Sequence, residues 1–390
     1  MPSLPALPAP AAPLPPSSFQ PNSQGFTNSA YSVSRGGAAI CVSGHVEVSA
    51  GTSMNRAINY QLPQNQYEVT QTFVSYISPG SPFMNNSLGG NTPISGSYDI
   101  GATLCLPRDG QASKGVQLLT HGVGFDRYYW DFAQNYSYVD AAVSNGYAAF
   151  FYDRLGVGVS EKADPLAVVQ SPLEVEIAHS LALLLQNGTI GGKAYTKVIG
   201  VGHSFGSIIT QALTMQYPTL LDAAILTGFS VSGAGLAAFF AGLNWDLANQ
   251  NAARFAGLNN GYIVSDTEIS NQIGFYHYPG FDPAILAKAE ATKASATFGE
   301  IFTTGAAGGN ATAYTNPVAV VNGLEDLPFC YGNCSYPVDL AAQVKSLYPA
   351  VPAAAFKTYL GQDAGHALNL HYAAADAFSW TMSFLSSNGL

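Results

Sequence analysis

The feature that most constrains the fold is a repeated alternation of short apolar runs with helical patterns. The runs read GVQLLTHG, YAAFFYDRLG, KVIGVGHS, AAILTG, PVAVVNG and FKTYLG, and each ends in or before a turn that contains glycine. Continuous apolar runs bounded by such turns are typical of parallel strands buried on both faces. Strands that alternate with helices build a parallel sheet covered by helices on both faces. The sequence therefore predicts an α/β protein.

The clearest helical pattern between these runs covers residues 171–187. Ser171 is expected to cap this helix, Pro172 to occupy its first turn and Glu174 to complete a capping box. Its apolar residues recur every three or four positions, which is the period of a helix with one buried face. Two further helices are expected over residues 204–217 and 371–385.

The region before the first run has a different pattern. Residues 1–25 are rich in proline and carry no charge, which predicts an extended arm without a core. Three later segments, 39–48, 67–77 and 98–106, combine β-branched and aromatic residues between Gly, Ser and Asn clusters. These segments are predicted to be antiparallel strands that precede the parallel sheet.

A long insertion separates the fourth and fifth apolar runs. Residues 230–316 exceed by far the length of one helix with two short loops. We therefore predict a core formed by residues 26–229 and 317–390, with a mostly helical cap at 230–316. The aromatic residues of the insertion could form an inner face over a site or pack the cap itself; they are Phe239, Phe240, Trp245, Phe255, Tyr262, Phe275, Tyr276, Tyr278 and Phe281.

Charge and hydropathy exclude two classes of partner. The chain carries 14 Lys and Arg against 24 Asp and Glu, a net charge of −10, and it has no basic run. Such a surface repels phosphate backbones and anionic lipid, so no nucleic-acid partner is expected. No stretch approaches the roughly 20 apolar residues of a membrane-spanning helix. We expect no stable membrane insertion, and the sequence leaves the oligomeric state open.

The four cysteines indicate disulfide bonds. Three pairings are formally possible, and we expect Cys330–Cys334, around a short turn, together with Cys41–Cys105. Disulfides form in oxidising compartments, and Asn-x-Ser/Thr sites such as the one at Asn85 would suit a secreted glycoprotein. Because the N-terminus does not read as a signal peptide, we expect a secreted protein whose signal peptide is not part of this sequence.

The strongest chemical motif is Gly-His-Ser-Phe-Gly at residues 202–206. It follows the apolar run KVIGV directly and precedes the predicted helix 204–217. A strand that turns abruptly into a helix, with glycines two positions before and after a serine, is the nucleophile elbow G-x-S-x-G. This turn exposes the hydroxyl at the carboxyl edge of the sheet. Ser204 is therefore the predicted nucleophile.

A serine hydroxyl needs a base, and a histidine is the usual one. Among the seven histidines, His366 lies in a loop after the run FKTYLG, which brings it to the same edge as Ser204. His371 is the alternative, although the predicted helix 371–385 would include it. His203 is adjacent to Ser204, but the elbow directs its side chain elsewhere. We predict that His366 is the general base.

The base in turn needs a carboxylate that fixes its tautomer. The sequence Gly-Leu-Glu-Asp at residues 323–326 ends the run PVAVVNG, between Ser204 and His366 in chain order. Asp326 is the predicted acid, and Glu325 is the alternative. The negative charge that develops on a substrate carbonyl needs preplaced donors. We expect the amides of Phe205 and Val123 to supply them, with Gly122 as the alternative to Val123.

The motifs GHSFG, HGVG, DRLGVG, GLED and the late GH together resemble those of the α/β-hydrolase superfamily, over about residues 96–390. The order nucleophile, acid, base is also that of the superfamily. The composition and the extra N-terminal β segment are similar to those of secreted fungal serine esterases and lipases. The resemblance implies an α/β-hydrolase fold. It also argues against epoxide hydrolases and dehalogenases, in which the nucleophile is an aspartate, because this chain has Ser204.

These observations predict a serine hydrolase that cleaves carboxylic esters through an acyl-enzyme, without a cofactor or metal ion. The aromatic cap favours a small-molecule ester of moderate size with an apolar or aromatic part. The same triad could cleave amides or lactones or transfer an acyl group. The fold could also belong to a protein that binds a ligand without hydrolysing it.

Overall fold

A nine-stranded sheet forms the centre of the protein. The computed structural model describes residues 19–390, so most of the predicted N-terminal arm lies outside the described residues. The sheet order is β1-β2-β3-β7-β4-β8-β9-β13-β14. Its strands are β1 (Thr27–Val33), β2 (Ala39–Ile58), β3 (Leu88–Pro107), β4 (Val116–Thr120), β7 (Ala148–Tyr152), β8 (Val198–His203), β9 (Ala223–Thr227), β13 (Val318–Gly323) and β14 (Phe356–Gly361).

The strand directions confirm the predicted combination of antiparallel N-terminal strands and a parallel sheet. β1, β2, β3 and β7 pair antiparallel to one another, and every pair from β7 through β4, β8, β9 and β13 to β14 is parallel. All six predicted apolar runs are strands of this parallel part. Every residue of β4, β7, β8, β9 and β13 is buried, as expected for strands covered on both faces.

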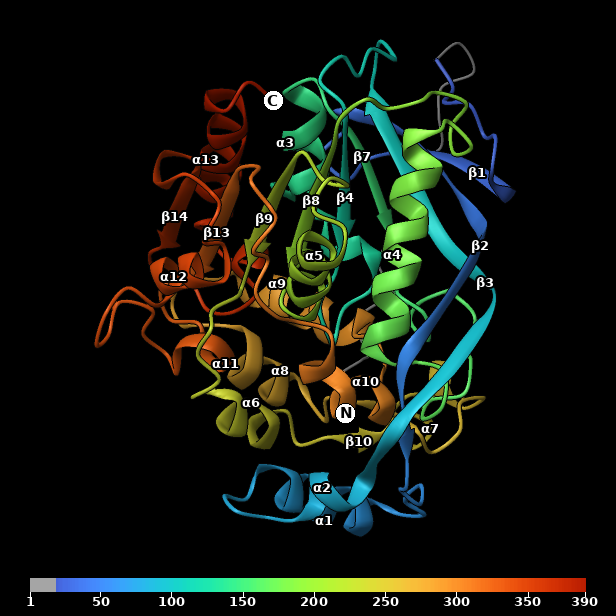
Figure 1. Ribbon diagram of the computed structural model, residues 1–390, viewed down its shortest axis with the longest axis vertical. Helices are drawn as coiled ribbons and strands as arrows, with labels where there is room; N and C mark the ends of the chain where they lie inside the picture. The colour runs from blue at the N-terminus through green and yellow to red at the C-terminus, as the bar shows by residue number, and fades with distance from the viewer. Residues whose placement is uncertain (1–18) are drawn as a thin grey trace.

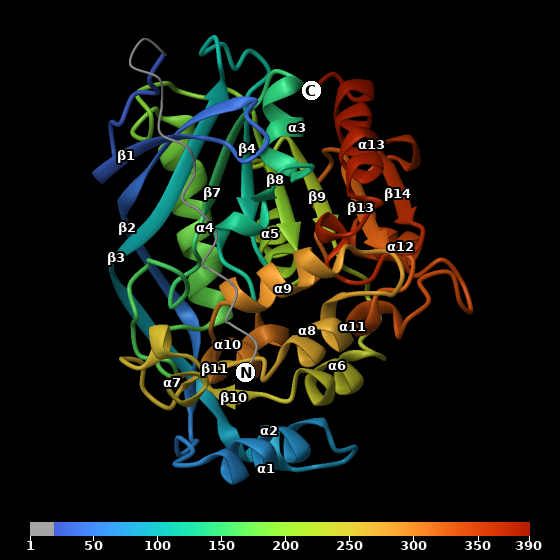
Figure 2. The same cartoon turned by 180° about the vertical axis from the view of Figure 1, so that it is seen from behind.

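Helices cover both faces of the sheet. α4 (Ser171–Gln186) and α5 (Phe205–Gln216) lie together in front of the sheet in Figure 1. α3 (Tyr138–Ser144) and α13 (Ala374–Ser387) cover the opposite face, which Figure 2 shows. Within residues 19–390, no helix is both long and apolar enough to cross a bilayer. The fold is the α/β-hydrolase fold that the sequence predicts.

The insertion between β9 and β13 lies at the carboxyl ends of the parallel strands (Figures 1 and 2). It contains α6 (Leu236–Leu243), α7 (Ala248–Asn251), α8 (Glu268–Phe275), α9 (Pro283–Thr292), α10 (Phe298–Thr303) and a small sheet of β10 (Asp246–Leu247), β11 (Tyr262–Val264) and β12 (Ala296–Thr297). Short elements outside this cap include α11 (Leu327–Cys330), α12 (Leu340–Gln343), β5 (Asp131–Ala133) and β6 (Tyr136–Ser137). Helices are the main regular structure of the cap, but loops make up much of it, so it is less helical than predicted.

The segment 67–77, predicted to be a strand, is instead helix α1 (Gln66–Ile77). Asn65 caps it by accepting a hydrogen bond from the Glu68 amide at 3.1 Å, and Val69 and Phe73 are buried one turn apart. The helical spacing of the buried residues and the cap outweigh the strand preference of the β-branched residues in this segment. β2 and β3 extend together beyond the sheet and carry α1 and α2 (Phe83–Ser87) to the cap, where α1 packs against α6 (Figure 2).

Two predicted helix boundaries are also wrong. Ser171 is the first residue of α4 rather than its cap, and its hydroxyl donates to the Thr303 carbonyl. Glu174 is drawn into a buried ion pair instead of closing a capping box. The last helix begins at Ala374, so His371 precedes it. In each case a tertiary contact replaced the local interaction that the sequence pattern suggested.

Both predicted disulfides are present, and they differ in the loops that they close. Cys41 and Cys105 face each other across β2 and β3 and are separated by 64 residues in the chain. Cys330 and Cys334 are separated by 4 residues and lie after the predicted acid Asp326. The first bond restricts a long segment of the unfolded chain, and the second only a single turn.

The loop lengths predict different losses of stability. Replacing Cys41 and Cys105 by alanine should lower the free energy of unfolding by about 4 kcal/mol, and replacing Cys330 and Cys334 by about 2 kcal/mol, because the longer loop loses more entropy on closure. Guanidinium unfolding without reductant measures both, and the second double variant is the matched control. Equal losses would contradict this assignment.

Candidate active site

The backbone at Ser204 is strained in the way that a nucleophile elbow requires. Ser204 joins β8 to α5 with φ 55° and ψ −117°, a region that non-glycine residues rarely adopt. The turn leaves no room for side chains beside it. A Cβ on Gly202 would lie 2.3 Å from the Gly206 carbonyl oxygen, and a Cβ on Gly206 would lie 2.0 Å from the Thr120 carbonyl oxygen. Both glycines are therefore required by the close approach of backbones.

The structure brings the three predicted side chains into one hydrogen-bonded chain. His366 Nε2 lies 2.8 Å from Ser204 Oγ, and His366 Nδ1 lies 2.6 Å from Asp326 Oδ2. The carboxylate can only accept, so we assign the proton to Nδ1, which leaves Nε2 to accept from the hydroxyl. Asp326 and His366 are almost completely buried, and Ser204 is 8% exposed. This arrangement can remove a proton from the serine.

The loop after β13 holds Asp326 in position. Asp326 caps α11, because its Oδ1 accepts a hydrogen bond from the Phe329 amide at 2.9 Å while Oδ2 faces His366. Glu325, the alternative acid, points elsewhere, and its Oε2 accepts from the Ala364 amide at 3.0 Å. The structure therefore places Asp326, and not Glu325, on the histidine.

His371, the alternative base, is part of the framework. Its Nδ1 lies 2.9 Å from the Ala367 carbonyl oxygen, to which it donates, and its Nε2 accepts hydrogen bonds from the amides of His277 and Gly365, both at 3.0 Å. Burial lowers the pKa of His371 to about 4. The neutral ring joins the cap at His277 to the loop that carries His366, and it has no nitrogen left for a serine.

The predicted oxyanion donors lie beside Ser204. Phe205 begins α5, so its amide has no acceptor inside the helix. Val123 follows Gly122, where an added Cβ would lie 2.9 Å from Ser204 Cβ. In the chain from residue 19 onwards, the amides of Phe205 and Val123 have no recorded acceptor. The oxyanion role of these two amides stays a prediction.

A buried network that the sequence analysis missed supports this loop. The Arg154 amide donates to His121 Nε2 at 3.0 Å, and the Arg154 guanidinium donates to the His121 carbonyl oxygen at 3.2 Å. The same guanidinium pairs with Glu174 and Glu300 and lies 4.5 Å from the centre of the Phe205 ring. The network therefore holds the segment before Val123 and contacts the side chain of Phe205 itself. Sequence alone offers no signal for it, because Glu300 is 146 residues from Arg154.

Only part of the aromatic set in the cap faces the histidine. The rings of Phe239, Phe275 and Phe329 lie 5.8, 6.1 and 5.8 Å from the His366 ring, the last contributed by α11. The other predicted aromatic residues pack elsewhere. Phe240 and Trp245 stack near α1, Phe255 and Tyr262 form a separate cluster, Tyr276 and Phe281 pack on His371, and Tyr278 is exposed.

Helix α6 separates the triad from an apolar cavity of about 550 Å³. The cavity is bounded by α1, α2, α6 and α10, and Phe240 lines it. Phe239, the preceding residue of the same helix, contacts the His366 ring. One turn of α6 thus borders both His366 and the cavity.

His203, beside the nucleophile, is held away from it. Its ring stacks on Tyr129 with centroids 4.3 Å apart, and its Nδ1 lies 3.1 Å from Thr227 Oγ1. Burial, and then the repulsion that a second proton would meet from His366 and His121, keep the pKa of His203 well below its usual value. Gly228 leaves room for both rings, because a Cβ there would lie 2.8 Å from His366 Cε1 and 2.9 Å from His203 Cε1. His203 is therefore a neutral packing residue.

The strand order and the elbow at the carboxyl edge of the sheet define an α/β-hydrolase. The sequence profile described as the alpha/beta hydrolase family matches residues 117–378, and the chain belongs to this family. No curated protein matches the sequence.

Solved structures with this fold resemble the chain. A soluble variant of monoglyceride lipase from Saccharomyces cerevisiae is 16% identical, with a TM-score of 0.53 over 75% of this chain and 92% of that one. An esterase from Thermogutta terrifontis is 14% identical, with a TM-score of 0.47 over 75% and 95% of the two chains. Epoxide hydrolase VrEH1 from Vigna radiata is 15% identical, with a TM-score of 0.47 over 74% and 95%. At 16% identity the likeness to the lipase shows the fold alone, and the similarity to fungal esterases stays a prediction.

The depressed pKa of His203 predicts a pH-dependent effect of its replacement. The pKa of His203 in the folded protein lies well below 6.5, so the unfolded chain takes up this proton first as the pH falls. Protonation of His203 in the unfolded chain therefore lowers the free energy of unfolding below about pH 6.5. The destabilisation caused by His203→Gln at pH 7 should therefore become smaller at pH 5, because only the wild-type protein loses stability through this histidine as the pH falls. Urea unfolding of both proteins at the two pH values measures it. The same gap at both pH values would show that His203 is not held neutral.

Proposed function

We propose that the protein is a serine hydrolase that cleaves carboxylic esters through an acyl-enzyme. One observation carries the proposal: Ser204 Oγ, the His366 ring and the Asp326 carboxylate form a continuous chain at 2.8 and 2.6 Å, at the junction of β8 and α5. Membership of the alpha/beta hydrolase family supports it. A hydroxyl, a base and an orienting carboxylate in series are the parts that acyl transfer requires.

In the proposed reaction, Ser204 Oγ forms a bond to the ester carbonyl carbon while its proton moves to His366 Nε2. The negative charge on the carbonyl oxygen is met by the amides of Phe205 and Val123, each worth roughly 3–4 kcal/mol in the transition state. When this tetrahedral intermediate collapses, the bond between the carbonyl carbon and the alcohol oxygen breaks. The alcohol leaves with the proton from His366. Water then attacks the acyl-enzyme by the same steps and releases the acid.

The surroundings of the triad favour an uncharged substrate with an apolar or aromatic part. Phe239 and Phe275 from the cap and Phe329 from α11 enclose the His366 ring. Ser204 is only 8% exposed, so the substrate reaches it under the cap rather than along an open groove. A small-molecule ester of moderate size fits such a site better than a polymer chain.

The disulfides bear on where the enzyme acts. Cys41–Cys105 and Cys330–Cys334 leave no free cysteine in the described chain, residues 19–390. Disulfides of this kind persist in oxidising environments. We therefore propose that the enzyme is secreted.

Variants of the triad test the role of each residue. Ser204→Ala and His366→Ala should each lower kcat/KM for a chromogenic ester by about 10⁶-fold, and Asp326→Ala by about 10⁴-fold, with the fold retained. Asp339→Ala is the matched control, because Asp339 caps α12 through the Ala342 amide at 2.9 Å just as Asp326 caps α11. Its activity should be unchanged.

Two results would contradict this assignment. An active Asp326→Ala variant together with an inactive Glu325→Gln variant would transfer the acid role to Glu325. Rates measured for aryl esters, anilides and lactones at equal enzyme concentration test the bond that is cleaved. We expect esters to be cleaved fastest, and faster cleavage of anilides or lactones would replace ester hydrolysis as the proposed activity.

A further inference from the structure

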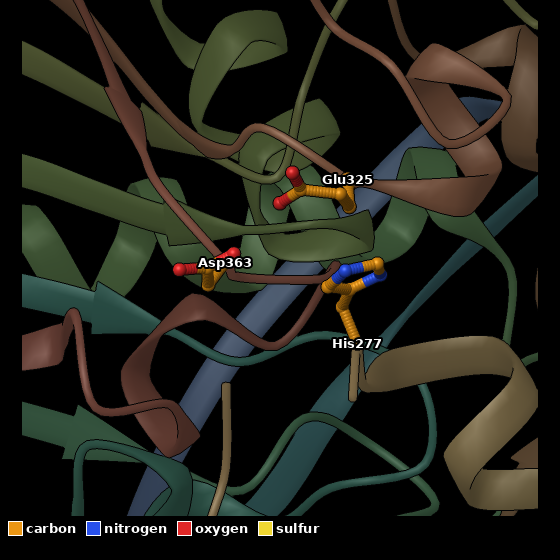
Figure 3. Close-up of side chains that lie close together, drawn as sticks. All are labelled: His277, Glu325 and Asp363. Atoms are coloured by element: carbon orange, nitrogen blue, oxygen red, sulfur yellow. The ribbon is translucent and has the colours of Figure 1, made fainter. Parts of the chain in front are cut away.

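Three side chains of types that can bind metal ions come from distant parts of the chain and meet beside the cap. His277 lies between α8 and α9, Glu325 follows β13, and Asp363 follows β14. Their potential ligand atoms all lie within 4.8 Å of one another. Figure 3 shows the imidazole and the two carboxylates around a common space. No metal ion is predicted from the sequence.

Two of the three side chains in this cluster are carboxylates. Neither Glu325 nor Asp363 forms an ion pair with a lysine or arginine in the part of the chain that the structure describes. Glu325 Oε2 accepts one amide hydrogen bond, which anchors the carboxylate, and its other oxygen has no hydrogen-bond partner among residues 19–390. His277 is half-buried and supplies a nitrogen donor, so the group is not merely a set of exposed acids.

We propose that His277, Glu325 and Asp363 bind one divalent zinc ion, with water completing the coordination. One imidazole with two carboxylates suits Zn²⁺, whereas Ca²⁺ takes six to eight oxygen ligands. Tetrahedral bonds of about 2.0–2.2 Å place ligand atoms roughly 3.3–3.6 Å apart. The donors, which lie within 4.8 Å, reach this spacing by rotation of side chains that are at least partly exposed.

The ion would join the cap to both loops that carry the triad's acid and base. Glu325 precedes Asp326, and Asp363 lies three residues before His366, while His277 belongs to the cap. The His371 ring already binds the amides of His277 and Gly365, so the backbones of these segments are held together beside the cluster. Zinc would therefore stabilise the closed arrangement of cap and loops. This role does not depend on the proposed ester hydrolysis.

Titration of chelator-treated protein with zinc chloride tests the site. Isothermal calorimetry should show one zinc ion per chain, and zinc should raise the thermal midpoint. His277→Ala and Asp363→Asn should each weaken zinc binding by at least about tenfold. Asparagine tolerates the positive φ of 52° at Asp363, so the second variant keeps the turn even if the first disturbs the cap.

Two controls make the result specific. His45→Ala removes a half-buried histidine beside Asp99, and Asp109→Asn removes an exposed aspartate in another turn; neither should change zinc affinity. The titration is repeated on Ser204→Ala, so that failure of the proposed ester hydrolysis does not affect it. Absence of zinc binding, binding unaffected by His277→Ala and Asp363→Asn, or preference for Ca²⁺ would overturn the proposal.

Discussion

Between β8 and α5 the chain turns from strand to helix within one residue, and the room for this turn comes from the absence of side chains around it. Ser204 takes a φ of 55°, which is unfavourable for a residue with a Cβ. Gly202 and Gly206 allow the strand, the helix and β4 to approach so closely that any Cβ would overlap a backbone carbonyl. The parallel sheet stabilises the strained turn, and the turn places the hydroxyl at the sheet edge.

The rest of the site follows from that edge. Parallel strands end on the same side of a sheet, so the loops after β8, β13 and β14 meet although they are far apart in the chain. Much of these loops is buried, and a buried polar atom without a hydrogen-bond partner costs free energy. Their buried polar groups therefore need hydrogen-bond partners within the protein. Asp326 therefore binds both His366 and its own helix α11, and His371 accepts two amides. The cap places the rings of Phe239 and Phe275 against the His366 ring.

The sequence predicted the parallel strands and the three triad positions because their signals are local. A buried strand is a run of apolar residues, and the elbow is a five-residue pattern. The segment 67–77 was assigned wrongly because its β-branched residues concealed the spacing of Val69 and Phe73 and the Asn65 cap. The Arg154 network and the cluster at His277 could not be predicted. Their members are joined only by the fold, and no single segment carries their pattern.

The most direct test of the account is whether Ser204 alone behaves as an activated nucleophile. An aryl fluorophosphonate reacts with a serine hydroxyl only where a base and oxyanion donors assist it. Intact-mass measurement followed by peptide mapping should show one adduct per chain, on Ser204, and none in the His366→Ala variant. An unlabelled protein, or an adduct on another residue, would contradict the proposed mechanism.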